Sequence, residues 1–289
     1  MAVTKKKGGA AAPPKVAATP STPAGSLALP TVPTKPRQRL KDYLVLIYGE
    51  KKIGKSTLVS RFEKTFFLMM EPGGKALEIF QPTDDAGNPT PIQSWGTFLD
   101  YMALLEKDKA FETVCIDTVD LAYQLCQDWV CEKRGFEHPN DAEDYGKTWS
   151  ACKQEFHRAL IRLGALDKGL VLLSHAKDKE ITKRSGIKHS VILPTMSNQA
   201  WEVVEPLVDC VFYYTYGSRK GERVLQLQGD ELVSAGNRLQ NEIDAFMLDG
   251  RPLHEIDMGS NPDQAYRNLL DAFECKYKPP QAEQEEIQL

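Results

Sequence analysis

"GEKKIGKST" occupies residues 49–57 and lies between an apolar run, "YLVLIY" at 43–48, and an amphipathic helical pattern. The segment matches the pattern GxxxxGK[ST], and a strand before it with a helix after it is the context in which that pattern binds phosphate. The two glycines let the backbone curl so that successive N–H groups point at phosphate oxygens. Lys55 then brings a mobile positive charge to the β- and γ-phosphates, and the Ser56 hydroxyl can ligate Mg²⁺. We therefore predict that this loop binds ATP through Gly49, Glu50, Lys51, Lys52, Ile53, Gly54, Lys55, Ser56 and Thr57.

The composition of the chain is that of an ordinary globular protein. Of its 289 residues, 42% are hydrophobic and 26% are charged. The apolar runs are much shorter than the roughly 18 residues that a membrane helix needs, and the start has no signal-peptide pattern. We therefore expect no membrane partner and a cytoplasmic location. The six cysteines form no CxxC pair, so we interpret them as reduced thiols rather than metal ligands.

Charge is distributed unevenly along the sequence. Residues 1–41 contain eight basic and no acidic residues, which leaves 28 basic against 40 acidic residues in the remainder. Residues 1–40, rich in Ala, Pro and Lys, are predicted to form a disordered basic arm that serves either as a linker or as a DNA-binding tail. Residues 276–289 are predicted to form an acidic flexible tail. Because the expected domain at 41–275 is acidic, any contact with nucleic acid must come from local basic segments or from the arm.

Strand-like runs alternate with helical patterns between the two tails. Apolar runs predict strands at 43–48, 66–70, 113–117, 170–174, 209–216 and 223–228. Apolar residues repeated at three- and four-residue intervals predict helices at 56–64, 95–108, 120–134 and 147–166. This alternation predicts a single α/β domain with a mainly parallel sheet flanked by helices.

Two acidic residues stand where predicted strands end. Asp117 closes "TVCID", and at the carboxyl edge of a parallel sheet it would lie level with the phosphate loop. We predict that Asp117 binds Mg²⁺ together with Ser56; the alternative is an aspartate that only caps a turn or helix. Glu71 directly follows "FFLMM" and is the best placed carboxylate to orient an attacking water; the alternative is an ordinary turn residue.

The motifs "GEKKIGKST", "MMEPGG", "VCIDTVD", "LLSHAK" and "SAGNR" together resemble those of phage-encoded, AAA-type RecA-like ATPases of single-strand annealing and recombination. This resemblance covers about residues 43–245 and implies a RecA-like P-loop core. It implies that Lys55 and Glu71 act in catalysis and that Ser56 and Asp117 hold the metal. It also implies that His175, with Ser174, senses the γ-phosphate of bound ATP.

The resemblance also concerns basic residues later in the chain. The segment "AKDKEITKRSGIKHS" follows His175 and is the densest basic run of the domain. In the resembling family the corresponding loop faces single-stranded DNA, and a merely solvated hairpin is the alternative. Arg238 in "SAGNR" resembles a catalytic arginine that reaches the γ-phosphate of a neighbouring subunit, the alternative being a surface arginine. The predicted DNA-binding residues are Lys177, Lys179, Lys183, Arg184 and Lys188.

The function expected from these motifs is that of a Mg²⁺-dependent ATPase that assembles on single-stranded DNA, as a ring or filament, and promotes annealing or recombination. One alternative is a RecA-fold ring helicase or translocase, and another is a nucleotide-gated DNA-binding scaffold with little hydrolysis. The expected ligands are ATP and Mg²⁺. The expected partners are single-stranded DNA, further copies of the chain and a single-strand-binding protein, in the cytoplasm of a bacterial host.

Overall fold

The computed structural model of this chain describes residues 29–182, 188–218 and 221–280. The chain divides into two compact units, residues 1–36 and 37–289, and every helix and strand described lies in the second. Most of the predicted arm and tail lies outside the described residues. Packing of the second unit continues to Tyr277, a buried residue whose hydroxyl accepts a hydrogen bond from the Asp257 backbone N–H at 2.9 Å.

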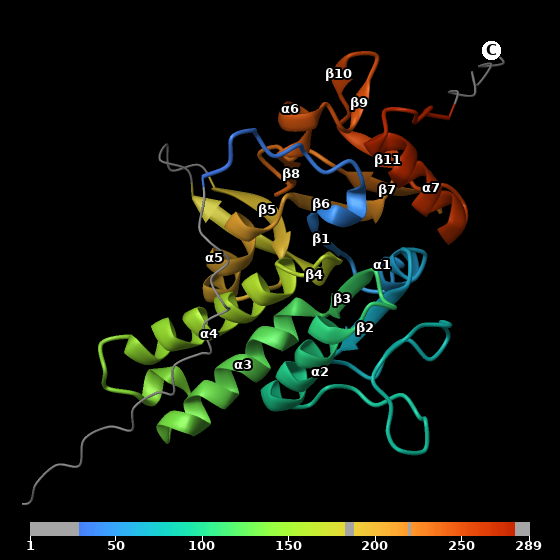
Figure 1. The fold of residues 1–289 in the computed structure, drawn as a ribbon. Coiled ribbons are helices and arrows are strands. Elements are labelled where there is room, and N and C mark those ends of the chain that lie inside the picture. Colours follow the sequence, from blue (N-terminus) through green and yellow to red (C-terminus); the bar gives the residue numbers. More distant parts are fainter. Residues whose placement is uncertain (1–28, 183–187, 219–220, 281–289) are drawn as a thin grey trace, which may run out of the picture. The chain divides into compact units, whose positions relative to one another are not determined.

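A central sheet organises the second unit (Figure 1). Strands β6, β1, β4, β3 and β2 lie side by side in that order and run parallel. Beyond β6 the sheet continues with β7 (Arg223–Gln226), which is antiparallel to both neighbours, and then with β11 (Glu255–Asp257). The predicted α/β class with a mainly parallel sheet is therefore confirmed. The parallel strands are Cys210–Tyr216 (β6), Leu44–Gly49 (β1), Gly169–Thr182 (β4), Thr113–Asp117 (β3) and Thr65–Met69 (β2).

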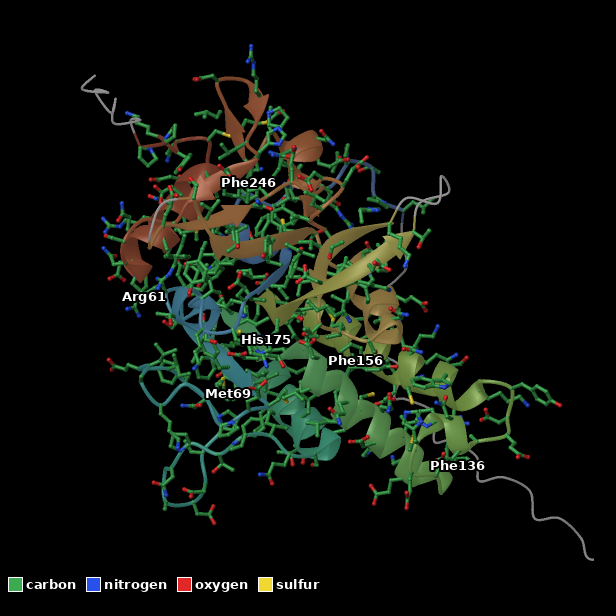
Figure 2. All side chains as sticks on the ribbon, turned by 180° about the vertical axis from the view of Figure 1, so that it is seen from behind. Arg61, Met69, Phe136, Phe156, His175 and Phe246 are labelled. Carbon is green, nitrogen blue, oxygen red and sulfur yellow. The ribbon has the colours of Figure 1, made fainter. Side chains whose placement is uncertain are left out.

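Helices cover both faces of the sheet, as predicted. Side chains alternate along a strand, so Val45 and Ile47 of β1 pack on one face and Leu46 packs on the other. Figure 2 shows the two cores through Phe246 and Phe156, which lie on opposite sides of the sheet. The first face carries α1 (Lys55–Val59) and α7 (Pro262–Phe273), and the second carries α2 (Trp95–Lys107), α3 (Val119–Arg134), α4 (Lys147–Gly164) and α5 (Asn198–Leu207).

The strand predicted at 170–174 is too short, because β4 continues to Thr182. There it pairs antiparallel with β5 (Lys188–Pro194), and Thr182 lies opposite Lys188. The basic segment after His175, predicted as a loop, therefore belongs largely to two paired strands, and whether it contacts DNA stays a prediction. Residues 169–174 of β4 are buried in the sheet and residues 178–182 are exposed.

The helix predicted at 56–64 is too long, because α1 ends at Val59. The chain must reverse to enter β2 at Thr65, and it does so through Lys64, which has a φ of +43°. The Thr65 hydroxyl donates to the Phe62 backbone oxygen at 3.1 Å and closes this turn.

Helices α5 and α7 were not predicted, although each begins at a side chain that caps it. Ser197 accepts from the Ala200 N–H, and Asn261 accepts from the Gln264 N–H. No helix among the described residues is long and apolar enough to cross a membrane. The remaining short elements are η1 (Leu40–Asp42), η2 (Pro139–Asp141), β8 (Gly236–Asn237), α6 (Leu239–Ile243), β9 (Met247–Leu248) and β10 (Arg251–Pro252).

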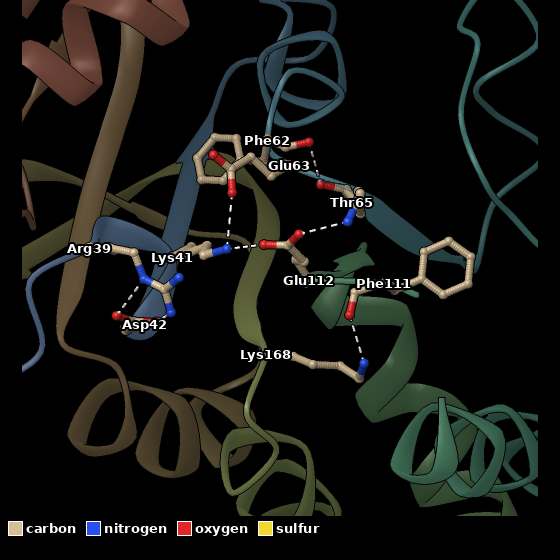
Figure 3. A network of polar contacts seen from close by, with 10 residues as sticks. Arg39, Lys41, Asp42, Phe62, Glu63, Thr65, Phe111, Glu112 and Lys168 are labelled. Carbon is tan, nitrogen blue, oxygen red and sulfur yellow. Dashed lines mark hydrogen bonds and ion pairs between the residues drawn. The ribbon is translucent and has the colours of Figure 1, made fainter. Parts of the chain in front are cut away.

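The amino edge of the sheet, where the parallel strands begin, carries a network of ion pairs (Figure 3). Lys41 Nζ lies 2.9 Å from a Glu63 carboxylate oxygen and also contacts the Glu112 carboxylate. Glu112 forms a further ion pair of 3.0 Å with Lys64. Lys168 Nζ donates to the Phe111 backbone oxygen at 2.7 Å. Opposite charges are therefore matched within the chain at this edge.

Candidate functional site

The phosphate loop, residues 49–57, connects the end of β1 to α1 at the carboxyl edge of the sheet. A Cβ on Gly49 would overlap the Tyr214 backbone oxygen across the β1–β6 pair, so only glycine fits there. Gly54 has a φ of +108°, a conformation that favours glycine. Ile53 is fully buried in the core and anchors the loop. Both glycines of the motif are thus required by the backbone itself.

Lys55 folds back over this loop. Its Nζ donates to the backbone oxygens of Gly49 at 2.9 Å and Glu50 at 2.8 Å, and it lies 3.3 Å from His175 Nδ1. Burial lowers the pKa of Lys55 to about 8, although nearby Asp117 opposes this shift. Phosphate oxygens can replace the neutral backbone partners with stronger, charge-assisted hydrogen bonds.

Ser56 and Asp117 form the second contact of the site. The Ser56 hydroxyl donates to an Asp117 carboxylate oxygen at 2.6 Å, joining the start of α1 to the end of β3. Burial raises the pKa of Asp117, while the hydrogen bond from Ser56 and the charge of Lys55 oppose that rise. A hydroxyl and a carboxylate are hard oxygen donors that suit Mg²⁺, which usually takes only one or two protein ligands besides water and substrate phosphate. A cation here would also offset the unfavourable burial of the Asp117 charge.

Glu71 and His175 complete the group. Glu71 follows β2 and is 48% exposed, and one of its oxygens lies 3.9 Å from His175 Nε2. Burial, followed by the charge of Lys55, lowers the pKa of His175, so the neutral ring can accept from Lys55 at Nδ1 and direct its Nε2–H toward Glu71. The exposed carboxylate is free to contact water near the phosphate loop.

The carboxyl edge of the parallel sheet thus brings together residues from four strands. Met69 of β2 is opposite Asp117 of β3 in the sheet register, and Gly49 of β1 is opposite His175 of β4. Figure 2 labels Met69 and His175 in the central part of the molecule. In chemical terms the arrangement can hold a triphosphate, bind a hard divalent cation and position a water. The assigned roles of the individual residues remain predictions.

The predicted DNA-binding lysines have different environments in the β4–β5 hairpin. Lys177 is half-buried and donates to the backbone oxygens of Thr195 and Met196 at 3.1 and 2.8 Å, so its ammonium is committed to the fold. Lys179 is exposed and Lys188 forms an exposed ion pair of 2.7 Å with Glu180. Two further predicted residues lie outside the described part of the chain: Lys183 and Arg184.

Arg238 lies at the amino edge, away from the phosphate loop. Its guanidinium donates to the backbone oxygens of Pro206 at 3.2 Å and Val208 at 3.0 Å, at the end of α5. It also lies 3.7 Å from Asp209, which precedes β6 and accepts from the Leu44 N–H. The structure therefore does not bring Arg238 to the site of its own chain.

Two features near the loop were missed by sequence reasoning. The first is Arg223, whose Nη1 lies 3.9 Å from the position of a Cβ on Gly54. It begins β7, and because β7 runs antiparallel, the start of this strand lies at the carboxyl edge. The signal was the hairpin sequence "YGSRKGERV" at 216–224, which indicates a reversal of direction and so brings the start of the next strand to the edge where the parallel strands end.

The second missed feature is a buried polar group around Asp120. Asp120 lies in the first turn of α3. Its carboxylate also accepts from the hydroxyls of Ser174 at 3.1 Å and Thr195 at 2.6 Å. Thr195 follows β5, so no local sequence pattern indicates this contact.

Three comparisons with known proteins give matches of different extent. A family described as "AAA domain" matches residues 41–239. The SPbeta prophage-derived uncharacterized protein YorG of Bacillus subtilis (strain 168) is 24% identical over 144 residues, which are 48% of this chain and 42% of that protein. The chain therefore spans less than half the length of that relative. The crystal structure of the RadB recombinase gives a TM-score of 0.38 at 13% identity, covering 68% of this chain and 84% of that one.

Proposed function

The chain belongs to the family of AAA domains, and we propose that it binds ATP with Mg²⁺ at the carboxyl edge of its sheet and hydrolyses it. The observation that carries this proposal is the Ser56–Asp117 hydrogen bond of 2.6 Å beside the Lys55 ammonium. It joins a hydroxyl, a carboxylate and a cation from two strand ends at one phosphate loop. These three groups do little to stabilise the fold. Burial disfavours the charged form of Asp117, and the hydrogen bond from Ser56 offsets this effect only in part.

Each residue has a distinct part in the proposed reaction. Lys55 leaves its contacts with the loop backbone and binds the β- and γ-phosphate oxygens. Ser56 and Asp117 hold Mg²⁺, which neutralises charge on the phosphates when it is bound. Glu71 accepts a hydrogen bond from the attacking water and orients it in line with the γ-phosphate. His175, already in contact with Lys55, responds to the presence of that phosphate.

We further propose that nucleotide binding is coupled to single-stranded DNA through the β4–β5 hairpin, in a RecA-like manner. His175 lies in β4 itself, and its backbone oxygen accepts from the Thr195 N–H at 2.9 Å at the base of the hairpin. A shift of His175 is therefore transmitted along a continuous strand to the exposed lysines. Neutralisation of DNA phosphates by these lysines would support strand annealing or recombination.

We also propose that copies of this chain assemble. An arginine at the amino edge, such as Arg238, can reach a γ-phosphate only at the carboxyl edge of another subunit. A head-to-tail contact of this kind generates a ring or a filament. Arg238 would then have to leave the backbone oxygens at the end of α5 that it now contacts.

The test is ATP turnover measured with and without single-stranded DNA, alongside annealing and unwinding assays of the same preparation. We expect Mg²⁺-dependent turnover that single-stranded DNA stimulates, with annealing and no unwinding. Unwinding instead of annealing would assign a translocase, and tight ATP binding without turnover would assign a scaffold. Lack of ATP binding would refute the proposal.

The DNA-binding part has a separate test in the hairpin. The double variant Lys179→Ala, Lys188→Ala should reduce the slope of log affinity for single-stranded DNA against log salt by about 1.4, because each lost phosphate contact removes about 0.7. The matched control is Lys107→Ala, Lys109→Ala, which removes the same charge from exposed positions near the amino edge. Equal slopes for the two double variants would assign DNA binding to another part of the chain.

A further inference from the structure

A cavity adjoins the phosphate loop on the side away from Asp117. It has a volume of about 300 Å³ and lies between the loop, strands β6 and β7, and the start of α7. Lys52 and Thr57 contribute from the loop, Tyr214 and Arg223 from the strands, and Pro262 from α7. Its volume is at the lower end of the range of small-molecule sites. None of the described residues that line it is acidic.

Arg223 reaches this cavity because of the sheet register. It pairs with Tyr216 across the β6–β7 ladder, and residues two apart in a strand share a face, so Arg223 lies on the same face as Tyr214. Burial raises the pKa of Tyr214, and the neighbouring Arg223 guanidinium opposes that rise. Among the described residues, no carboxylate forms an ion pair with Arg223, and its buried Nε has no hydrogen-bond partner. A partly buried guanidinium without a carboxylate partner is stabilised when it binds an anion.

The polarity of a bound nucleotide follows from the order of the strands. Asp117, Glu71 and His175 mark the end at which the γ-phosphate and metal are bound, and they belong to the side of the loop formed by β4, β3 and β2. The cavity lies on the other side, beside β6 and β7. A triphosphate laid along the loop with its γ-phosphate at Glu71 must therefore direct its α-phosphate and nucleoside toward the cavity.

We propose that this cavity holds the α-phosphate and ribose of the nucleotide, with the Arg223 guanidinium bound to the α-phosphate. The inference rests on the proposed function and adds a residue that distinguishes a nucleoside triphosphate from pyrophosphate, which has no α-phosphate. Tyr214 lines the same cavity and interacts with the guanidinium. The wall formed by Leu58, Pro262 and Ala265 offers the sugar an apolar surface.

The test compares two ligands on the same proteins, ATP and inorganic pyrophosphate, each with Mg²⁺; pyrophosphate fills the β- and γ-phosphate positions and leaves the α-phosphate position empty. Arg223→Gln removes the charge but keeps an amide that can donate to Tyr214. This variant should weaken ATP binding about 10- to 100-fold, the effect of one charge-assisted contact, while pyrophosphate binding changes less than about threefold. Arg223→Lys should recover part of the loss, because the charge returns without the forked geometry. Arg251→Ala is the matched control, at an exposed arginine of β10.

Two outcomes would overturn the inference alone: equal losses for ATP and pyrophosphate in Arg223→Gln, or no loss for either ligand. A parent protein that binds neither ligand would overturn the proposed function and this inference with it. Thermal unfolding of each variant without ligand establishes that it is folded. If Arg223→Gln does not fold, the ratio of ATP to pyrophosphate affinity in Arg223→Lys decides the question, and an unchanged ratio contradicts the proposal.

Discussion

A lysine at the amino edge of the sheet and a lysine at its carboxyl edge differ in their partners and in the direction of their pKa shifts. At the amino edge, burial alone would lower the pKa of Lys41, but hydrogen bonds with Glu112 and Glu63 raise it. At the carboxyl edge, burial dominates and lowers the pKa of Lys55 to about 8. Lys41 is paired with carboxylates of its own chain, whereas Lys55 contacts neutral groups. A buried cation left without a carboxylate indicates a ligand-binding edge, and a matched network indicates a structural one.

Cavity size alone would have suggested the other edge. A cavity of about 510 Å³ lies at the amino edge among Lys41, Glu112 and Lys168, and it is larger than the one beside the phosphate loop. Its charged walls are already neutralised by ion pairs. The two edges therefore differ in whether their buried charges are paired within the chain, and cavity volume does not identify the ligand-binding edge.

The largest expected effect concerns turnover at the carboxyl edge. Glu71→Gln should lower the rate of ATP hydrolysis by about 10²- to 10⁴-fold, because the amide cannot accept a proton from water, and should leave ATP affinity nearly unchanged. The control is Glu78→Gln, at an exposed position of the same connection. Steady-state turnover and equilibrium binding measure the two quantities. Undiminished turnover in Glu71→Gln would move the catalytic role to another residue.

A lysine from each edge gives the most direct paired comparison. Lys55→Ala should weaken ATP binding about 10- to 100-fold, because a charge-assisted contact to phosphate is lost. Lys41→Ala should leave ATP affinity unchanged and lower the unfolding temperature. Calorimetric titration and thermal unfolding of both variants measure this. The distinction between the edges fails if Lys41→Ala loses as much ATP affinity as Lys55→Ala.

Arg238 tests whether the amino edge is only structural, because it lies at that edge and has a proposed catalytic role. Mixing Arg238→Ala subunits with Lys55→Ala subunits should restore turnover several-fold above the sum of the separate variants. Only the mixture contains interfaces with both an intact phosphate loop and an intact Arg238. If both variants assemble and mixing gives no gain, Arg238 serves only its contacts at the end of α5.

The smallest expected effect concerns the amino-edge network. Hydrogen bonds from Lys41 and then Lys64 lower the pKa of Glu112 from 4.5 to about 2, so its contribution to stability is present above pH 4.5 and is lost as the pH falls toward 2. Glu112→Gln should lower the unfolding temperature at pH 7 by about 1 to 3 °C, as expected for exposed pairs. The difference from the parent should shrink below pH 4.5. A constant difference across this range, or an equal loss in the control Glu132→Gln on α3, would contradict the role of the network.

Sequence patterns predicted the fold class and grouped several residues of the candidate site, because both depend on local signals. Apolar runs marked the parallel strands, and a parallel sheet brings the ends of such strands to one edge, so Glu71 and Asp117 could be grouped with the phosphate loop before their contacts were known. The pairing of Lys55 with His175 depends on β4 lying next to β1. That adjacency was expected only through the resemblance to RecA-like ATPases.

What could not be predicted depends on contacts between distant segments. Arg223 reaches the loop only because β7 is antiparallel; the turn sequence before this strand indicates a reversal of direction but not which side chain of the strand meets the loop. Lys177 was grouped with DNA-binding lysines, but it is held by backbone oxygens that follow β5. Charge density in a sequence cannot separate a lysine that is committed to the fold from one that is available to a ligand.

The central claim is that nucleotide binds at the carboxyl edge and leaves the amino edge unchanged. Hydrogen–deuterium exchange of the full chain, with and without saturating ATP and Mg²⁺, tests both edges in one measurement. The account predicts slower exchange of backbone amides in residues 50–58, with no change in residues 37–42 and 105–112. Unchanged exchange in 50–58 at saturating ATP, or protection confined to the amino edge, would contradict it.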